Sequence, residues 1–128
     1  MSLSSAPEAV LLIAHGSRQE LANEEVRQVA ERLNAQFDRD SVIACFLEIA
    51  APTIPEAFDQ AVEMGARRIK AVPFFLGTGA HVGADLPRIL DACASRHDRL
   101  HLEVELTPAV GPDPLLDELV LRRIAGTG

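Results

Sequence analysis

The chain has 128 residues, of which 48% are apolar and 24% charged, and this composition indicates one globular domain and excludes a disordered or collagen-like chain. The net charge of -7 disfavours nucleic acid and anionic membranes as partners, because both would repel the protein at long range. Two cysteines that lie far apart, Cys45 and Cys93, form neither a disulfide framework nor an iron-sulfur motif.

The ends and the apolar runs of the chain predict its location. The first residues lack the pattern of a signal peptide, and no apolar run reaches the roughly 20 residues needed to span a bilayer. We therefore expect a cytoplasmic protein with a disordered tail over residues 1–8 and a single domain over residues 9–125.

The first half of the chain predicts two strand-helix units. Residues 10–14 form an apolar run typical of a buried strand, and residues 21–37 have helical periodicity. The apolar stripe of that helix consists of Val26, Val29, Leu33 and Phe37. A second strand is expected over residues 42–47, and the next helix begins with a capping box at Thr53 and ends at Gly65.

The second half predicts two more units. Residues 69–76 form an apolar strand that contains Pro73, where we expect a bulge because proline cannot donate a hydrogen bond to the sheet. Asp85 and Asp113, each followed by a proline, are expected to cap the third and fourth helices. Between them, residues 102–106 alternate apolar and acidic residues, as an edge strand does.

This alternation of strands and helices predicts the fold class. Right-handed crossovers place each helix over the sheet, so we expect a doubly wound α/β domain with a four-stranded, mostly parallel sheet and helices on both faces. Such a flavodoxin-like domain binds its ligands beyond the carboxyl ends of the strands.

Three residues with metal-binding side chains follow three successive predicted strands. They are His15, Glu48 and His81. Imidazole nitrogen and carboxylate oxygen together suit a divalent transition ion such as cobalt, nickel, iron or zinc, and three protein ligands leave positions open for a substrate. The pattern therefore predicts an open metal site.

Simpler explanations compete with a metal site. A histidine at a strand end is often satisfied by the backbone, and Glu48 alone could be a solvated charge. Ser17 fits a helix cap, and Arg18 fits an ordinary surface residue. The glycines near His81 lack the dinucleotide-binding spacing, and the chain has neither a phosphate-loop lysine nor a nucleophile elbow.

Four segments of the chain resemble a known family. LLIAHGSR, FLE, VPFFLGTGAHVGADLPR and VGPDPLLDELVLRR are similar to segments of the small class II tetrapyrrole chelatases, in particular the short sirohydrochlorin cobaltochelatases of the anaerobic cobalamin pathway. Related branches of this family insert iron, for sirohaem, or nickel. The resemblance extends from Val10 to Arg123.

The resemblance implies an activity and a set of site residues. The activity is insertion of a divalent metal, cobalt first and iron or nickel as alternatives, into sirohydrochlorin by a chelatase-type homodimer without a permanently bound cofactor. His15 and His81 match the catalytic histidines, and Glu48 matches the residue that coordinates the metal with them. For substrate binding we add Ser17, Arg18, Gly79 and Arg88, the two arginines because the substrate carries many carboxylates.

Two other functions stay open at this point. A protein that carries the metal or binds the tetrapyrrole would use the same residues without turnover. A phosphoryl-transfer enzyme would use His15 as its nucleophile.

Overall fold

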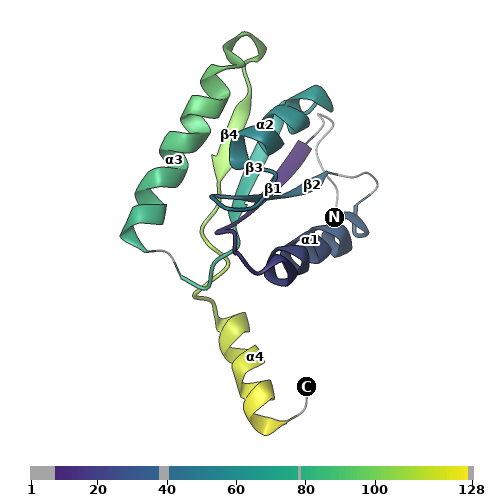
Figure 1. Ribbon diagram of the computed structural model, residues 1–128, viewed down its shortest axis with the longest axis vertical. Coiled ribbons are helices and arrows are strands. Elements are labelled where there is room, and N and C mark those ends of the chain that lie inside the picture. Colours follow the sequence, from purple (N-terminus) through teal and green to yellow (C-terminus); the bar gives the residue numbers. More distant parts are fainter. Residues whose placement is uncertain (1–7, 38–40, 78, 127–128) are drawn as a thin grey trace.

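The computed structural model describes residues 8–37, 41–77 and 79–126 of the chain, except for the side chains of Ala80 and His81 (Figure 1). The first half forms β1 (Glu8–Ala14), α1 (Glu20–Asn34), β2 (Val42–Phe46) and α2 (Ile54–Glu63). The second half forms β3 (Arg68–Pro73), α3 (Ala80–Ser95), a short 3-10 turn (Asp98–Leu100), β4 (Glu103–Leu106) and α4 (Pro114–Ala125). A tail was predicted over residues 1–8; residues 1–7 lie outside the described residues, and Glu8 belongs to β1 instead. No helix in the described ranges combines the length and apolarity needed to cross a membrane.

The four strands form one parallel sheet in the order β2-β1-β3-β4. This confirms the predicted α/β fold class and the position of β4 at an edge. The bulge expected at Pro73 was wrong, because β1 and β3 pair without interruption and β3 simply ends at Pro73. The Pro73 carbonyl accepts a hydrogen bond from Val110 N at 3.0 Å, beyond the end of β4. The missing N–H of Pro73 faces the same way, so the sheet loses no hydrogen bond there.

The sheet has a different helix layer on each face. On one face α2 and α3 pack against alternate residues of β1 and β3, and Phe58, Leu86 and Leu90 fill the core. On the other face α1 packs over β1 and β2 through Ala30, which contacts the cluster around Leu12. The period of two along each strand explains this division.

Three helix starts were predicted from capping residues, and two predictions are confirmed. Thr53 and Glu56 form the capping box of α2, and the Asp113 side chain accepts a hydrogen bond from Leu115 N at 2.8 Å. The prediction for Asp85 was wrong, because α3 begins at Ala80 and contains Asp85. Gly83 N donates to Gly79 O at 3.1 Å, so the helix has already formed a turn before Asp85.

The fourth helix departs from the prediction that every helix covers the sheet. None of its residues is buried, and Figure 1 shows α4 extending away from the rest of the molecule. The hydrogen bonds of Val110 and Gly111 to the residues that end β3 hold the preceding loop at the carboxyl end of the sheet, where α4 starts.

The two cysteines are buried free thiols, as expected for core residues. Burial raises the pKa of the Cys45 thiol to about 12 and also raises the pKa of the Cys93 thiol. Neither thiol is therefore available as a thiolate ligand or nucleophile near neutral pH.

Candidate functional site

His15 and Glu48 lie beside each other at the carboxyl end of the sheet. Parallel pairing of β1 and β2 continues beyond the two strands, because Leu47 N donates to Ala14 O at 2.9 Å and Glu48 N donates to His15 O at 3.1 Å. Both residues are exposed. Two of the three predicted metal-binding residues are thus adjacent through their backbones.

Gly16 allows this close approach. Its φ of +93° lies in the left-handed region, and a Cβ at this position would lie 1.8 Å from the carbonyl oxygen of Glu48. Any side chain here would force the His15 and Glu48 loops apart. The close contact and the positive φ therefore explain why a glycine follows His15.

A core aromatic residue supports the imidazole of His15. The rings of His15 and Phe75 lie 4.7 Å apart between centroids with an interplanar angle of 45°. Phe75 is only 8% exposed and follows the end of β3, so its ring is fixed by the core. Residues that follow three neighbouring strands thus build this part of the site, and the imidazole stays accessible to a ligand.

A strained turn follows Glu48. Ala50 N donates to Glu48 O at 2.7 Å, and the residue between them, Ile49, has a φ of +71°. This is a γ-turn with a positive φ, a rare and costly conformation for a β-branched residue. Such strain persists only where neighbouring contacts enforce it, and it concentrates at functional sites.

Arg27 of α1 supports the loop that carries this turn. Its guanidinium donates to Ala51 O at 3.0 Å and lies 5.3 Å from the centroid of the Phe46 ring. It also pairs with Glu20 at 2.5 Å and Glu24 at 3.1 Å, and the hydrogen bond to Glu20 raises the pKa of Arg27. Arg27 was not predicted as part of the site, because nothing in its helix pattern distinguishes it from a surface arginine.

Asn23 is a second residue that sequence reasoning missed. It is 3% exposed, and its side chain accepts from Ser17 N at 2.9 Å and donates to Ser17 O at 2.8 Å. These two bonds fix the loop after His15 to α1. The interpretation of Ser17 as a helix cap was wrong, because the N-cap of α1 is Gln19; the Ser17 hydroxyl accepts from Gln19 N at 3.0 Å in a turn before the helix. A buried amide near the start of an amphipathic helix was the signal that could have identified Asn23.

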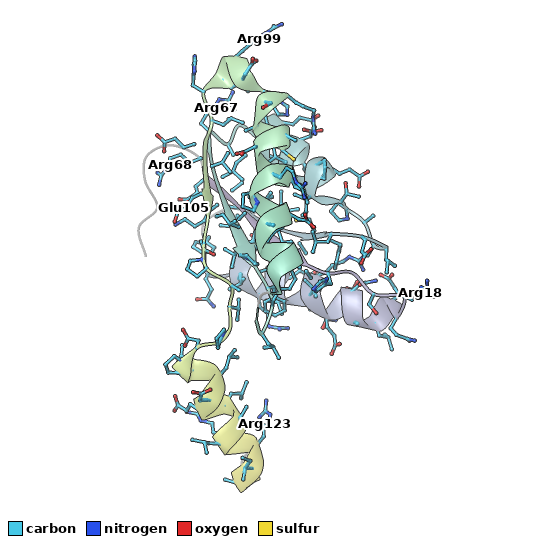
Figure 2. The ribbon with its side chains drawn as sticks, turned by 90° about the vertical axis from the view of Figure 1, so that its left-hand side faces the viewer. Arg18, Arg67, Arg68, Arg99, Glu105 and Arg123 are labelled. Carbon is cyan, nitrogen blue, oxygen red and sulfur yellow. The ribbon has the colours of Figure 1, made fainter. Side chains whose placement is uncertain are left out.

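The predicted substrate-binding residues differ in their surroundings. Arg18 is exposed at the start of α1, points away from the sheet in Figure 2, and has no side-chain partner among the described residues. Arg88 is exposed on α3 and pairs with Asp85, one turn away. Gly79 is the exposed N-cap residue of α3.

His81 lies in the first turn of α3, but its side chain is outside the description. Among the described residues, no three His, Cys, Asp or Glu side chains form a group that could hold a metal ion. The complete set of His15, Glu48 and His81 therefore stays a prediction.

Apolar side chains are exposed on the three segments that follow His15, Glu48 and Phe75 in the chain. They are Leu21 at 82% exposure, Ile49 at 61% and Leu76 at 76%. They belong to the start of α1, the loop after β2 and the loop after β3. A surface with this composition suits a ligand that has large apolar faces as well as charged groups.

Comparisons with known proteins point to one family. The family model CbiX matches residues 9–127. A sirohydrochlorin ferrochelatase from Priestia megaterium is 33% identical over 94% of this chain and 44% of its own length. Two sirohydrochlorin cobaltochelatases are also similar. That of Methanocaldococcus jannaschii is 37% identical over 71% of this chain and 64% of its own length, and that of Methanopyrus kandleri is 32% identical over 91% and 94%.

The fold is shared with solved chelatase structures. The sirohydrochlorin chelatase SirB from Bacillus subtilis, in complex with cobalt, has a TM-score of 0.83 and 30% identity, and it matches 93% of this chain and 50% of its own. A CbiX structure from Marinobacter aquaeolei VT8 has a TM-score of 0.78 and 24% identity, and it matches 94% and 95%. The chain thus spans about half the length of some relatives and nearly all of others. The match to the family model over residues 9–127 shows that the chain belongs to the CbiX family.

Proposed function

We propose that this chain inserts a divalent metal ion into sirohydrochlorin, with cobalt as the first candidate and iron or nickel as alternatives. The observation that carries the proposal is the backbone contact of 3.1 Å that holds an exposed imidazole residue, His15, beside an exposed carboxylate residue, Glu48. Membership of the CbiX family and the printed activities of its relatives support the same reaction.

Metal insertion sets three chemical demands. The protein must bind the ion weakly enough to release it, present it to the four ring nitrogens, and accept the two protons that the pyrroles lose. A neutral imidazole can ligate the ion or take a proton, and an incomplete ligand set leaves coordination positions for the macrocycle. His15 and Glu48, with His81 completing the set, meet these demands in our proposal.

The surroundings of the two residues fit their proposed roles. Phe75 fixes the imidazole ring, and Gly16 and Ile49 define the backbone on either side of the pair. The substrate would place its apolar ring faces against Ile49 and Leu76, while Arg18 attracts its carboxylates. The backbone of Ser17 is bonded to Asn23, so Ser17 would contribute its hydroxyl, while Gly79 would contribute a backbone contact and Arg88 would first have to leave Asp85.

We further propose that the active form is a homodimer whose two copies enclose one tetrapyrrole cleft. The chain matches about half of SirB, so two copies would supply a comparable amount of structure. The cytoplasmic location stays a prediction from the sequence.

The decisive experiment follows the absorbance of sirohydrochlorin with Co²⁺ and a catalytic amount of protein. We expect many turnovers for the natural chain and a loss of about 100-fold or more for His15→Ala, the size expected when a general base is removed. His101→Asn is the control, because His101 is exposed in the turn before β4. A full rate in His15→Ala would contradict the role of His15. Stoichiometric binding without turnover would instead support a carrier.

Parallel assays with Fe²⁺ and Ni²⁺ determine the metal. The rate of insertion, and not the binding affinity, is the informative quantity, because affinities follow the Irving-Williams order whatever the natural ion is.

A further inference from the structure

Three polar side chains in the first turns of α1 connect the two loops of the candidate site. They are Glu20, Asn23 and Arg27, and we call them the α1 bridge. Residues three or four positions apart lie on the same side of a helix, so the three side chains form one row. This side of α1 faces the loops that follow β1 and β2, because the row is hydrogen bonded to both of them.

The buried end of the bridge holds the loop that follows His15. The Asn23 side chain accepts from Ser17 N at 2.9 Å and donates to Ser17 O at 2.8 Å. Because Asn23 is only 3% exposed, water competes little for these bonds, and they hold Ser17 firmly. The chain is thereby attached to α1 two residues after His15.

The other end of the bridge holds the loop that follows Glu48. The Arg27 guanidinium donates to Ala51 O at 3.0 Å, three residues after Glu48. It also lies 5.3 Å from the centroid of the buried Phe46 ring, so it rests on a fixed part of the core. The Glu48 loop is thereby attached to the same helix as the His15 loop.

Glu20 joins the two ends of the bridge. Its carboxylate accepts from Arg27 at 2.5 Å and from the Asn23 amide at 3.4 Å. The hydrogen bond from Arg27 and the longer one from Asn23 lower the pKa of Glu20, so its carboxylate is ionised near neutral pH. A continuous chain of hydrogen bonds therefore runs from Ser17 through α1 to Ala51.

The bridge is a second connection between loops that already touch. At the first connection, Glu48 N donates to His15 O at 3.1 Å, and Gly16 packs on the Glu48 carbonyl. A contact at one place leaves two loops free to rotate about it, whereas a second contact farther along each loop prevents this rotation. Because the side chains of a functional site must be held within roughly 0.5 Å of their working positions, this restraint matters for the proposed metal ligands.

We propose that the α1 bridge is a positioning element for metal insertion, which sets the separation of His15 and Glu48 through their two loops. The inference rests on the proposed function, because it assigns residues that hold the proposed metal ligands in place. Replacing residues that support metal ligands in this way typically lowers activity by about 10- to 100-fold. The bridge should therefore affect the rate of insertion and leave substrate binding nearly unchanged.

The far end of α1 provides a matched control. Asn34 accepts from Val42 N at 2.7 Å and donates to Val42 O at 3.0 Å, and these bonds repeat the two that Asn23 makes to Ser17. Val42 is the first residue of β2, at the opposite end of the sheet from His15. If the role of Asn23 were merely structural, its replacement would resemble that of Asn34.

Steady-state kinetics of cobalt insertion test the exposed end of the bridge. We expect Arg27→Met to lower kcat about tenfold while the KM for sirohydrochlorin changes by less than about twofold. Arg32→Met is the control and should match the natural chain, because Arg32 is exposed in the last turn of α1 and has no side-chain partner among the described residues. An unchanged kcat in Arg27→Met, or a change in KM alone, would overturn the proposal.

The two asparagines separate positioning from stability. We expect Asn23→Ala and Asn34→Ala to lower the urea concentration at the midpoint of unfolding to a similar extent, because each removes hydrogen bonds to backbone groups. Only Asn23→Ala should slow insertion when the rates are compared at equal concentrations of folded protein. Equal rate losses in the two variants would mean that the rate follows stability, and the proposal would be wrong. Arg27→Met decides the question if Asn23→Ala does not fold.

The double variant Asn23→Ala/Arg27→Met tests whether the residues act as one unit. Losses from independent supports multiply, whereas a chain of contacts that is already broken at one point loses little more when it is broken at a second. We therefore expect the kcat of the double variant to lie within about twofold of that of the slower single variant. A loss equal to the product of the two single losses would contradict a continuous bridge.

An NMR measurement tests the positioning without the reaction. The Phe75 ring lies 4.7 Å from the imidazole of His15 and shifts the signals of its ring protons, so these signals report where the imidazole lies. In alkaline buffer, where free imidazole is neutral, we expect them to move in Arg27→Met and to stay in place in Arg32→Met. Unmoved signals in Arg27→Met would overturn this inference and leave the proposed function standing. A natural chain that does not insert cobalt would refute the proposed function, and the NMR result would still decide the bridge.

Discussion

At the amino end of the sheet charged side chains pair across three strands, whereas at the carboxyl end an imidazole and a carboxylate are exposed beside tight backbone contacts. Arg68 contacts Glu8 at 3.9 Å and Glu103 at 3.6 Å, and Lys70 contacts Glu8 at 3.7 Å and Glu105 at 3.9 Å. These pairs surround a shallow hollow of about 100 Å³. Each charge there has a partner, so the hollow offers no unpaired group for chemistry.

The carboxyl end is organised in the opposite way. Gly16 and Ile49 adopt positive φ angles on either side of the His15 and Glu48 contact, and Arg27 and Asn23 hold the loops from α1. One sheet thus concentrates regular, mutually satisfied interactions at one end and strained, incompletely partnered groups at the other. Substitutions at the two ends should therefore affect stability and activity differently.

The largest effect is expected for Gly16→Ala. A Cβ 1.8 Å from the Glu48 carbonyl oxygen, at a φ of +93°, should lower the free energy of unfolding by about 3 kcal/mol and abolish metal insertion. Urea unfolding and the cobalt assay measure the two effects. Gly65→Ala is the matched control, because Gly65 has a φ of +96° but no atom within 4 Å of its Cβ position. It should lose only about 1 kcal/mol and keep its activity. Equal losses in the two variants would mean that the close approach is unimportant.

Ile49→Gly tests whether the strained turn after Glu48 lowers stability while supporting activity. Glycine relieves the positive φ of the γ-turn, so we expect the free energy of unfolding to rise by about 1 kcal/mol while the rate of metal insertion falls. Thermal unfolding and the cobalt assay are the measurements. Ile49→Val keeps the branched side chain and should match the natural protein. A less stable glycine variant would show that the turn is not strained.

Asp59→Asn tests a stabilising contact remote from the site. The hydrogen bonds from His97 at 2.8 Å and from Arg96 lower the pKa of Asp59 below its usual 3.8. Because the carboxyl is more acidic in the folded protein, its contribution is complete above pH 3.8 and disappears as the pH falls through the lower folded value. The side chain is 42% exposed and screened by solvent, so we expect a loss of only about 0.5 kcal/mol at pH 7.

Unfolding of the Asp59→Asn variant and the natural protein at a series of pH values provides the measurement. The two stabilities should converge in strong acid, and metal insertion at pH 7 should be unaffected. A difference that persists unchanged at low pH would contradict the role of the ionised carboxylate.

The smallest effect is expected for Arg68→Met at the amino end. Its ion pairs are long, and Lys70 remains beside the buried Glu8 carboxylate, so the change should cost at most about 0.5 kcal/mol, and less at high salt because exposed charges are screened. Urea unfolding at low and high salt measures this dependence. A large loss of metal insertion in this variant would break the functional distinction between the two ends.

Local sequence patterns were sufficient to predict the succession of strands and helices along the chain, the parallel sheet, and the capping residues of α2 and α4. These features depend on the periodicity of apolar residues and on the residue types at turns and helix caps, and both can be read from residues that are close together in the chain. The sequence also placed His15 and Glu48 at one end of the sheet, because parallel strands end on the same side. The cap expected at Asp85 is absent because Pro87 lies inside α3 and not in its first turn.

Contacts between segments that are distant in the chain could be identified only in the folded structure. The need for glycine at position 16 comes from the Glu48 carbonyl, and the roles of Asn23 and Arg27 come from loops that fold back on α1. The outward direction of α4 depends on hydrogen bonds between Gly111 and the residues after β3. Local patterns carry no information about such distances, because these contacts exist only after the sheet has brought the segments together.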